Sequence, residues 1–226
     1  DYLYVLTKNN LTAQYIIGDN NKINVICLGI IKEKNTANIM ENNSITKEEY
    51  IIKYNSKGYS YYFPPGNYYF NPIYFLTANN SDITVFLEGV SSNFNSYNYK
   101  NTSIIYTNLQ DFMYDKRTTS SSITFYVKNL KFISKILFDY IPTGVCFGRE
   151  TSKGNEYNFH FTSVHIHGFE YGFKSPGYSC GSSGGEFNSF AHCKYGIYIK
   201  DASHLFNLQK SEFIYCVNGI RFGYGG

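Results

Sequence analysis

The chain has 226 residues, of which 43% are hydrophobic and only 16% are charged, and its formal net charge at pH 7 is +3. So small a charge does not favour nucleic acid as a partner. The absence of any apolar run of about 18 residues argues against insertion into a membrane. Tyrosine (24) and phenylalanine (19) supply the bulk and tryptophan is absent, so the surface suits hydrogen bonding and stacking with sugars.

The first segment predicts strands and one short helix. Residues 2–7 and 23–29 carry the alternating pattern of β-strands. Thr46 and Glu49 form a capping box, and Gly58 is placed to end a helix of about three turns. An amphipathic helix ahead of a repeat array typically covers the open end of its core. We therefore predict that residues 1–58 form an N-terminal cap of strands and a helix.

Residues 59–226 are predicted to form one continuous β domain. Residues 59–70 contain two aromatic strands around a Pro-Pro-Gly turn. Further strands are predicted at residues 83–89, 103–107, 123–127 and 130–133. No Pro/Gly/Ser-rich linker divides this segment, so we place a single domain here.

The last third of the chain repeats itself with a period of about two dozen residues. The repeats align on Gly144, Gly172, Gly196 and Gly219. Six positions before each glycine stands an apolar residue, namely Phe138, Ile166, Phe190 and Phe213. Three positions before each glycine stands another, namely Ile141, Phe169, Cys193 and Cys216. A fixed period of this length indicates stacked units, none of which buries its apolar face alone.

The repeated unit is best explained as one coil of a right-handed parallel β-helix. The residues after each glycine alternate as in a strand, and we expect the glycine itself to mark a bend between sheets. Sustained helical spacing and a leucine ladder are both missing, which argues against helical and leucine-rich repeats. The fold predicts that Phe190 lies directly under Phe213. Because the pattern still runs at Gly226, we expect the β-helix to continue beyond this chain.

Three segments resemble the entry region of β-helical phage tailspikes and of the wider pectate-lyase-like group. That family opens with V-x-D-F-G-A and G-D-G-x-x-D-D-T-x-A-I, followed after a helix by G-G-x-V-Y-F-P-P-G-x-Y. Residues 25–30 (VICLGI), 35–39 (NTANI) and 58–68 (GYSYYFPPGNY) stand in the same order. The chain departs from the family pattern at Cys27 and Leu28, which replace Asp-Phe, and it lacks the Asp pair.

The resemblance implies a receptor-binding virion protein of a phage tail, homotrimeric and attached to other tail proteins, that recognises bacterial surface polysaccharide. Many members of the group also cut that polysaccharide, and whether this chain is an enzyme is left open. A secreted, extracellular polysaccharide lyase or glycoside hydrolase is the alternative, and a purely structural tail component is a second one. No cofactor is implied.

Catalytic candidates come from the carboxylates of the last two coils. Glycoside hydrolysis needs two carboxyl groups about 5–5.5 Å or about 6.5–9.5 Å apart, but no Asp or Glu recurs at one repeat position. Glu186, Asp201 and Glu212 remain, each near a different corner, and they would have to converge in a groove with His192. The alternative is that they are scattered, solvated side chains.

A row of exposed residues is the main candidate for substrate binding. Lys174 and Arg221 share the position two after the repeat glycine, with Tyr198 between them. An aromatic face flanked by cations suits an acidic sugar chain. His192 is included as a residue that orients a sugar. The alternative is an ordinary solvent-facing strand surface.

Other polar groups are assigned structural roles. Glu170 and Lys194 occupy equivalent positions in neighbouring repeats and are predicted to form a surface ion pair. His165 and His167 alternate on one strand face, but no third ligand stands at matching spacing. We therefore predict no metal site.

Overall fold

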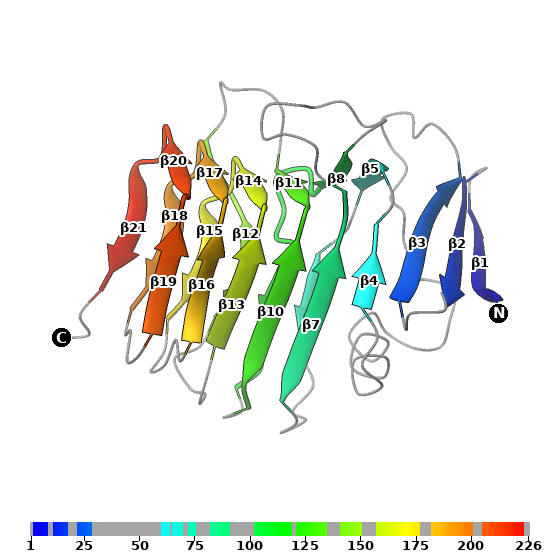
Figure 1. The fold of residues 1–226 in the computed structure, drawn as a ribbon, viewed down its shortest axis with the longest axis horizontal. Coiled ribbons are helices and arrows are strands. Elements are labelled where there is room, and N and C mark those ends of the chain that lie inside the picture. The colour runs from blue at the N-terminus through cyan, green and yellow to red at the C-terminus, as the bar shows by residue number, and fades with distance from the viewer. Residues whose placement is uncertain are drawn as a thin grey trace.

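In the computed structural model the chain forms a β-solenoid (Figure 1). It describes residues 2–8, 11–17, 22–28, 60–63, 65–69, 72–75, 82–90, 102–118, 121–134, 141–150, 157–176, 182–200 and 205–223. These residues contain strands and connecting turns and no helix. Within them, accordingly, no helix is long and apolar enough to cross a membrane. The helix predicted at residues 46–58 lies outside the described ranges.

The strands form three sheets, which we call A, B and C. Sheet A contains β1 (Tyr2–Lys8), β2 (Leu11–Ile17), β3 (Lys22–Leu28), β4 (Ser60–Tyr62), β7 (Ile83–Glu88), β10 (Ile123–Lys128), β13 (Tyr157–Thr162), β16 (Ser182–Glu186) and β19 (Leu205–Gln209). Sheet B contains β5 (Gly66–Tyr69), β8 (Ser103–Tyr106), β11 (Lys131–Ile133), β14 (His165–His167), β17 (Ser189–Ala191) and β20 (Glu212–Ile214). Sheet C contains β6 (Ile73–Phe75), β9 (Met113–Asp115), β12 (Val145–Arg149), β15 (Tyr171–Ser175), β18 (Tyr195–Ile199) and β21 (Asn218–Phe222).

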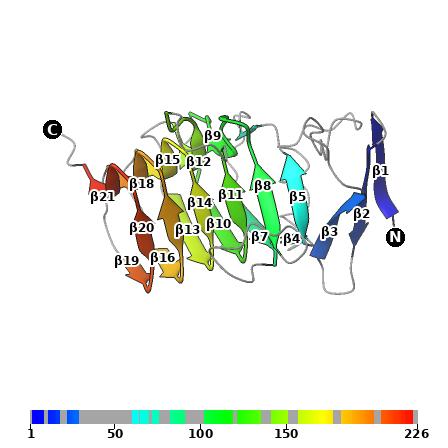
Figure 2. The same ribbon diagram turned by 90° about the horizontal axis from the view of Figure 1, so that it is seen from above.

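Sheets B and C are parallel throughout, and sheet A is parallel from β3 to β19. From β4 onward, each coil contributes one strand to each sheet in the order A, B, C. Figures 1 and 2 show the sheets as the faces of an elongated prism, with the two termini at opposite ends. This arrangement is consistent with a parallel β-helix. At the N-terminal end β1, β2 and β3 pair antiparallel, and β3 joins them to β4 in sheet A.

The alternation in the sequence determines which side chains enter the prism. In β7 every second residue is buried, namely Ile83, Val85 and Leu87. Sheet B contributes one inward residue per coil in matched register, and these residues are Tyr68, Ile105, Phe132, Ile166, Phe190 and Phe213. The core is therefore a stack of apolar rows, each of which is completed only by the coils above and below it.

The corner from sheet A to sheet B is made by one residue in the left-handed backbone region. Asn129, Ser163, Phe187 and Lys210 directly follow β10, β13, β16 and β19, with φ between 46° and 56°. None of them is glycine, although this conformation costs a side-chain-bearing residue about 1 kcal/mol or more. At Ser163, Phe187 and Lys210 the bend is therefore imposed by the packing of the coils, whereas Asn129 is a residue type that adopts this conformation readily.

The repeat glycines have a different role from the predicted one. Gly172, Gly196 and Gly219 lie inside β15, β18 and β21 and do not form bends. A Cβ atom at Gly172 would lie 2.5 Å from the carbonyl oxygen of Gly196 and 2.8 Å from Cδ1 of Phe190. Gly172 and Gly196 need to be glycine because the neighbouring backbone and a core ring approach too closely for any side chain, and at Gly219 the Phe213 side chain alone approaches, to 3.0 Å. Of the four, only Gly144, with φ of 79°, stands at a bend.

The first of the four predicted repeats is misaligned. Phe132, and not Phe138, is the register partner of Ile166. Likewise Phe173 pairs with Phe147. The alignment on Gly144 and Gly172 had instead placed Phe173 opposite Val145, because each directly follows its glycine. Ile141, predicted to face the core, is 83% exposed. The misalignment arises because the connection between β11 and β12 is longer than the later ones and contains apolar residues and a glycine at the spacing of the repeat. Phe138 itself lies outside the described residues.

Candidate functional site

The outer face of sheet C carries a row of tyrosines and cations that is interrupted only at Gly148. Consecutive coils place Tyr74, Tyr114, Gly148, Lys174, Tyr198 and Arg221 in register. The predicted neighbours Lys174, Tyr198 and Arg221 therefore lie side by side. We call the following set the aromatic strip: Tyr74, Tyr114, Lys116, Tyr171, Lys174, Tyr195, Tyr198 and Arg221.

Three tyrosines form the centre of the aromatic strip. The rings of Tyr171 and Tyr195 stack with centroids 4.9 Å apart and planes 12° apart. Tyr198 meets both rings edge-on, at 5.7 Å from Tyr171 and 5.8 Å from Tyr195. All three side chains are half-buried. Such a cluster presents flat apolar ring faces together with hydroxyl groups at the surface.

Cations lie on both sides of this centre. Lys174 Nζ lies 5.1 Å from the centroid of the Tyr171 ring and donates a 3.0 Å hydrogen bond to the hydroxyl of Tyr114. This bond crosses the intervening coil, which is possible because Gly148 has no side chain there. Burial lowers the pKa of Lys174, and nearby carboxylates oppose the shift. Arg221 Cζ lies 5.7 Å from the ring centroid of Tyr195.

The strip continues to the earliest coils. Lys116 Nζ lies 4.0 Å above the ring of Tyr74, a cation–π contact. The Tyr74 hydroxyl donates to Oδ2 of Asp111 at 3.1 Å. Burial, and then the charge of Asp111, raise the pKa of Tyr74 to about 12, so this hydroxyl stays protonated at neutral pH. Beside the strip, the predicted pair of Glu170 and Lys194 is formed, with 2.8 Å between the charged atoms.

Two of the three predicted catalytic carboxylates lie in the described part of the chain. Glu186 ends β16 on sheet A, where it lines a groove of about 480 Å³. Glu212 begins β20 on sheet B. Asp201 lies outside the described residues. Glu186 and Glu212 flank the corner between sheets A and B on adjacent coils, since the register partner of Glu186 is Gln209, three residues before Glu212.

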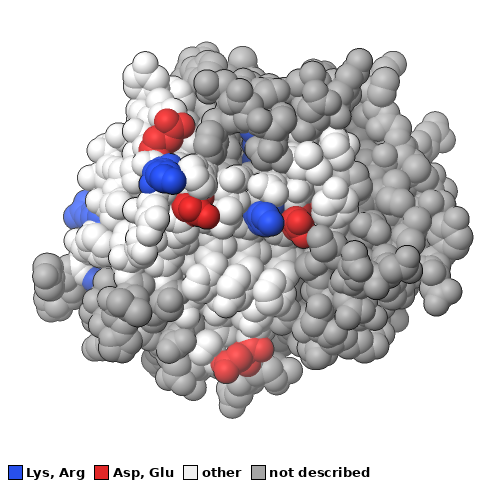
Figure 3. All heavy atoms as spheres, viewed as in Figure 1, with Lys and Arg blue, Asp and Glu red and all other residues white. Residues whose placement is uncertain are grey.

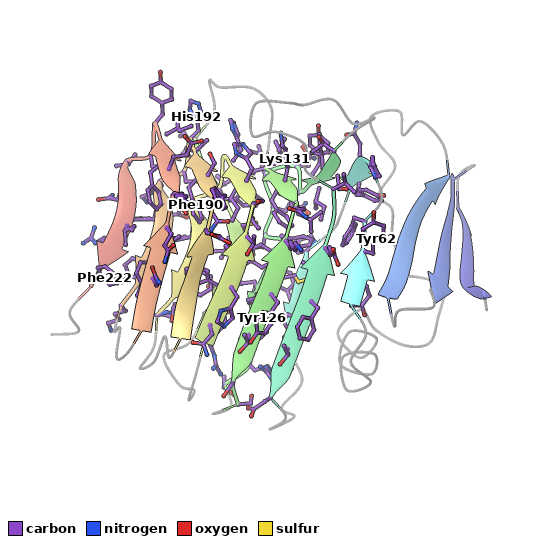
Figure 4. All side chains as sticks on the ribbon, viewed as in Figure 1. Tyr62, Tyr126, Lys131, Phe190, His192 and Phe222 are labelled. Atoms are coloured by element: carbon purple, nitrogen blue, oxygen red, sulfur yellow. The ribbon has the colours of Figure 1, made fainter. Side chains whose placement is uncertain are left out.

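His192 belongs to a stack of rings at the corner between sheets B and C. Its ring lies 5.0 Å from that of His167 and 5.1 Å from that of Tyr215. Its φ of 51° makes it one of the corner residues, and Figure 4 shows it at the rim of sheet B. His165 and His167 themselves are buried, with 5% and 3% of their surfaces exposed. No group of three potential metal ligands occurs in the part of the chain that the structure describes.

The sequence did not predict a buried ionic cluster at the end of β9 and β12. Asp115 accepts a 2.9 Å hydrogen bond from Nε of Arg117, and its other oxygen lies 3.5 Å from Nε of Arg149. All three side chains are at most 3% exposed. Arg149 is the register partner of Asp115 on the next coil. A correct alignment of these two coils would have revealed the pair, which ties the coils together.

Comparisons with protein-family models, with curated proteins and with solved structures found no match.

Proposed function

We propose that this protein is a receptor-binding virion protein of the phage tailspike type, which binds host cell-surface polysaccharide along the outer face of sheet C. The observation that carries the proposal is the aromatic strip. Right-handed winding of the coils and a capping helix at residues 46–58 are part of the same proposal. So are a homotrimeric state and attachment to other tail proteins.

The strip has the shape and chemistry that a polymer requires. It runs from Tyr74 on β6 to Arg221 on β21, which at about 4.8 Å per strand spacing is about 24 Å. Tyrosine faces stack on sugar rings, and their hydroxyls exchange hydrogen bonds with sugar hydroxyls. Lys116, Lys174 and Arg221 add positive charge, which favours a chain with carboxylate groups. We therefore infer an acidic polysaccharide as the ligand.

The proposal assigns binding, and not cleavage, to the described surface. Glu186 on β16 and Glu212 on β20 belong to sheets A and B, so neither lies on the aromatic strip of sheet C.

The proposal is tested by affinity electrophoresis against an acidic polysaccharide such as alginate or polygalacturonate, with neutral dextran as the reference. We expect retardation by the acidic polymers that weakens as salt is added. Tyr198→Ala should weaken binding by about tenfold, the loss of about 1.4 kcal/mol. Tyr215→Ala, which removes a tyrosine that is 81% exposed and outside the strip, should change it less than twofold. Equal binding by both variants, or equal retardation by dextran, would refute the proposal.

The mass of the protein in solution tests the assignment to a virion. A stable trimer supports the tailspike type of protein. A monomer that still binds acidic polysaccharide would instead favour the secreted lyase or hydrolase. A protein that binds no polysaccharide would favour a purely structural tail component.

A further inference from the structure

A second row of rings lies on the outer face of sheet A. Phe86, Tyr126 and His160 occupy one register position on β7, β10 and β13. The centroids of Phe86 and Tyr126 are 4.9 Å apart, those of Tyr126 and His160 are 4.5 Å apart, and the planes deviate by only 14° and 11°. Tyr126 is 39% exposed and is labelled on β10 in Figure 4. The three rings form a ladder with the spacing of the strands.

The ladder is interrupted at the next coil. The residue in register after His160 is Gly184, and Asn207 follows on β19. A Cβ atom at Gly184 would lie 1.8 Å from the carbonyl oxygen of Asn207. The backbone therefore excludes a side chain at this position, and the outward face of the His160 ring borders the groove that Glu186 lines.

The size of the interruption matches one six-membered ring. Two strand spacings, about 9.6 Å, separate β13 from β19. A ring stacked on His160 at the spacing seen in the ladder would occupy the middle of this gap and leave Asn207 on its far side. The groove of about 480 Å³ holds one such ring together with its substituents.

The groove walls supply hydrogen-bonding groups at the edge of that ring. Its lining includes Thr162, Glu186, Asn207 and Gln209, which offer a hydroxyl, a carboxylate and two amides. Figure 3 views this face and shows that most of its described surface is uncharged. Burial lowers the pKa of His160, so its ring is neutral at pH 7. A carboxylate beside the ring position disfavours an anionic ligand.

We propose that this groove is a binding site for one neutral pyranose ring, which stacks on His160 over Gly184 and exchanges hydrogen bonds with Glu186, Asn207 and Gln209. The site is on a different sheet from the aromatic strip and takes a ligand of different charge. It does not depend on the function proposed for sheet C.

Saturation-transfer NMR with single sugars tests the site. The probes are glucose, galactose, mannose and N-acetylglucosamine, with glucuronate as the anionic reference. We expect at least one neutral sugar to bind, with transfer strongest to the ring protons, and glucuronate to bind at least tenfold more weakly. His160→Ala should reduce affinity by about tenfold, and so should Asn207→Tyr, which places a side-chain ring at the edge of the gap.

Two control variants distinguish a sugar bound in this groove from one bound elsewhere on the prism. Phe86→Ala removes an equivalent ring two coils away and should leave sugar binding within twofold of the original. Tyr215→Ala, which removes an exposed ring outside both the groove and the aromatic strip, should do the same. Loss of binding in Tyr198→Ala with retention in His160→Ala would overturn the inference and place the sugar on the aromatic strip. Binding of none of the four neutral sugars, or binding of phenol in preference to all of them, would also overturn it.

Discussion

The rings of Phe190 and Phe213 lie one above the other on adjacent coils, with centroids 5.1 Å apart and planes 13° apart. They are register partners in β17 and β20. Phe190 is completely buried and is labelled inside the prism in Figure 4. This contact is the one that the repeat in the sequence predicted, and it shows that these coils stack in the expected register.

Removing one ring of this stack should strongly destabilise the protein. Phe190→Ala is expected to lower the free energy of unfolding by about 3–5 kcal/mol, because it removes buried apolar surface and leaves a cavity. Phe222→Ala, at a site that is 49% exposed, should cost about 1 kcal/mol or less. Urea unfolding measures both. Similar losses in the two variants would mean that Phe190 is not a core residue.

The close packing of coils around the repeat glycines predicts that substitution of Gly196 is more destabilising than substitution of Gly223. A Cβ atom at Gly196 would lie 2.6 Å from the carbonyl oxygen of Gly219 and 2.7 Å from the Phe213 ring. Gly196→Ala should therefore cost about 1–3 kcal/mol or more, since the backbone must move. At Gly223 the nearest atom is the Tyr198 hydroxyl at 3.3 Å, so Gly223→Ala should be nearly neutral. If Gly196→Ala keeps the original thermal midpoint, this packing argument fails.

The buried ionic cluster should tolerate the loss of its carboxylate poorly. Asp115→Ala removes the buried carboxylate that contacts the buried guanidinium groups of both Arg117 and Arg149. We expect a loss of about 3–5 kcal/mol. Glu170→Ala breaks the half-exposed pair with Lys194 and should cost much less, because solvent screens this pair. Denaturant titration of the two variants compares the pairs directly, and an equally small cost at Asp115 would contradict the assignment.

The buried histidines predict that stability falls in mild acid. Burial lowers the pKa of His165 to about 3 and that of His167 to about 4, from an ordinary value of 6.5. Below pH 6.5 the unfolded chain therefore binds protons that the folded chain does not. The free energy of unfolding should decrease by about 1.4 kcal/mol per pH unit for each histidine, from pH 6.5 down to about pH 4.

Two measurements check this pH dependence. Unfolding between pH 7 and pH 4.5 gives the slope, and the imidazole NMR signals of the folded protein report protonation directly. The His165→Gln variant should show a shallower slope than the original chain. Imidazole signals of His165 and His167 that titrate near pH 6.5 would contradict the prediction.

Much of the solenoid could be predicted from local patterns. The period-two alternation identified the strands at residues 83–88 and 123–128, because inward and outward residues must alternate in a strand. The alignment of the last three repeats predicted that Phe190 lies under Phe213. It also predicted that Lys174, Tyr198 and Arg221 lie in one row on consecutive coils. Short strands such as β6 and β9, with three residues each, carry too little pattern to be recognised.

The sequence by itself determined that the chain builds stacked β-coils with tyrosine and cationic side chains on an outer face, since both follow from a pattern that repeats within each coil. The tertiary structure alone decided which residues of distant coils meet. It paired Phe132 with Ile166, brought Arg149 to Asp115, and set Gly184 beside His160. The physical reason is that register between coils depends on the lengths of the connections and on how side chains pack across the core, and neither is encoded in any single strand.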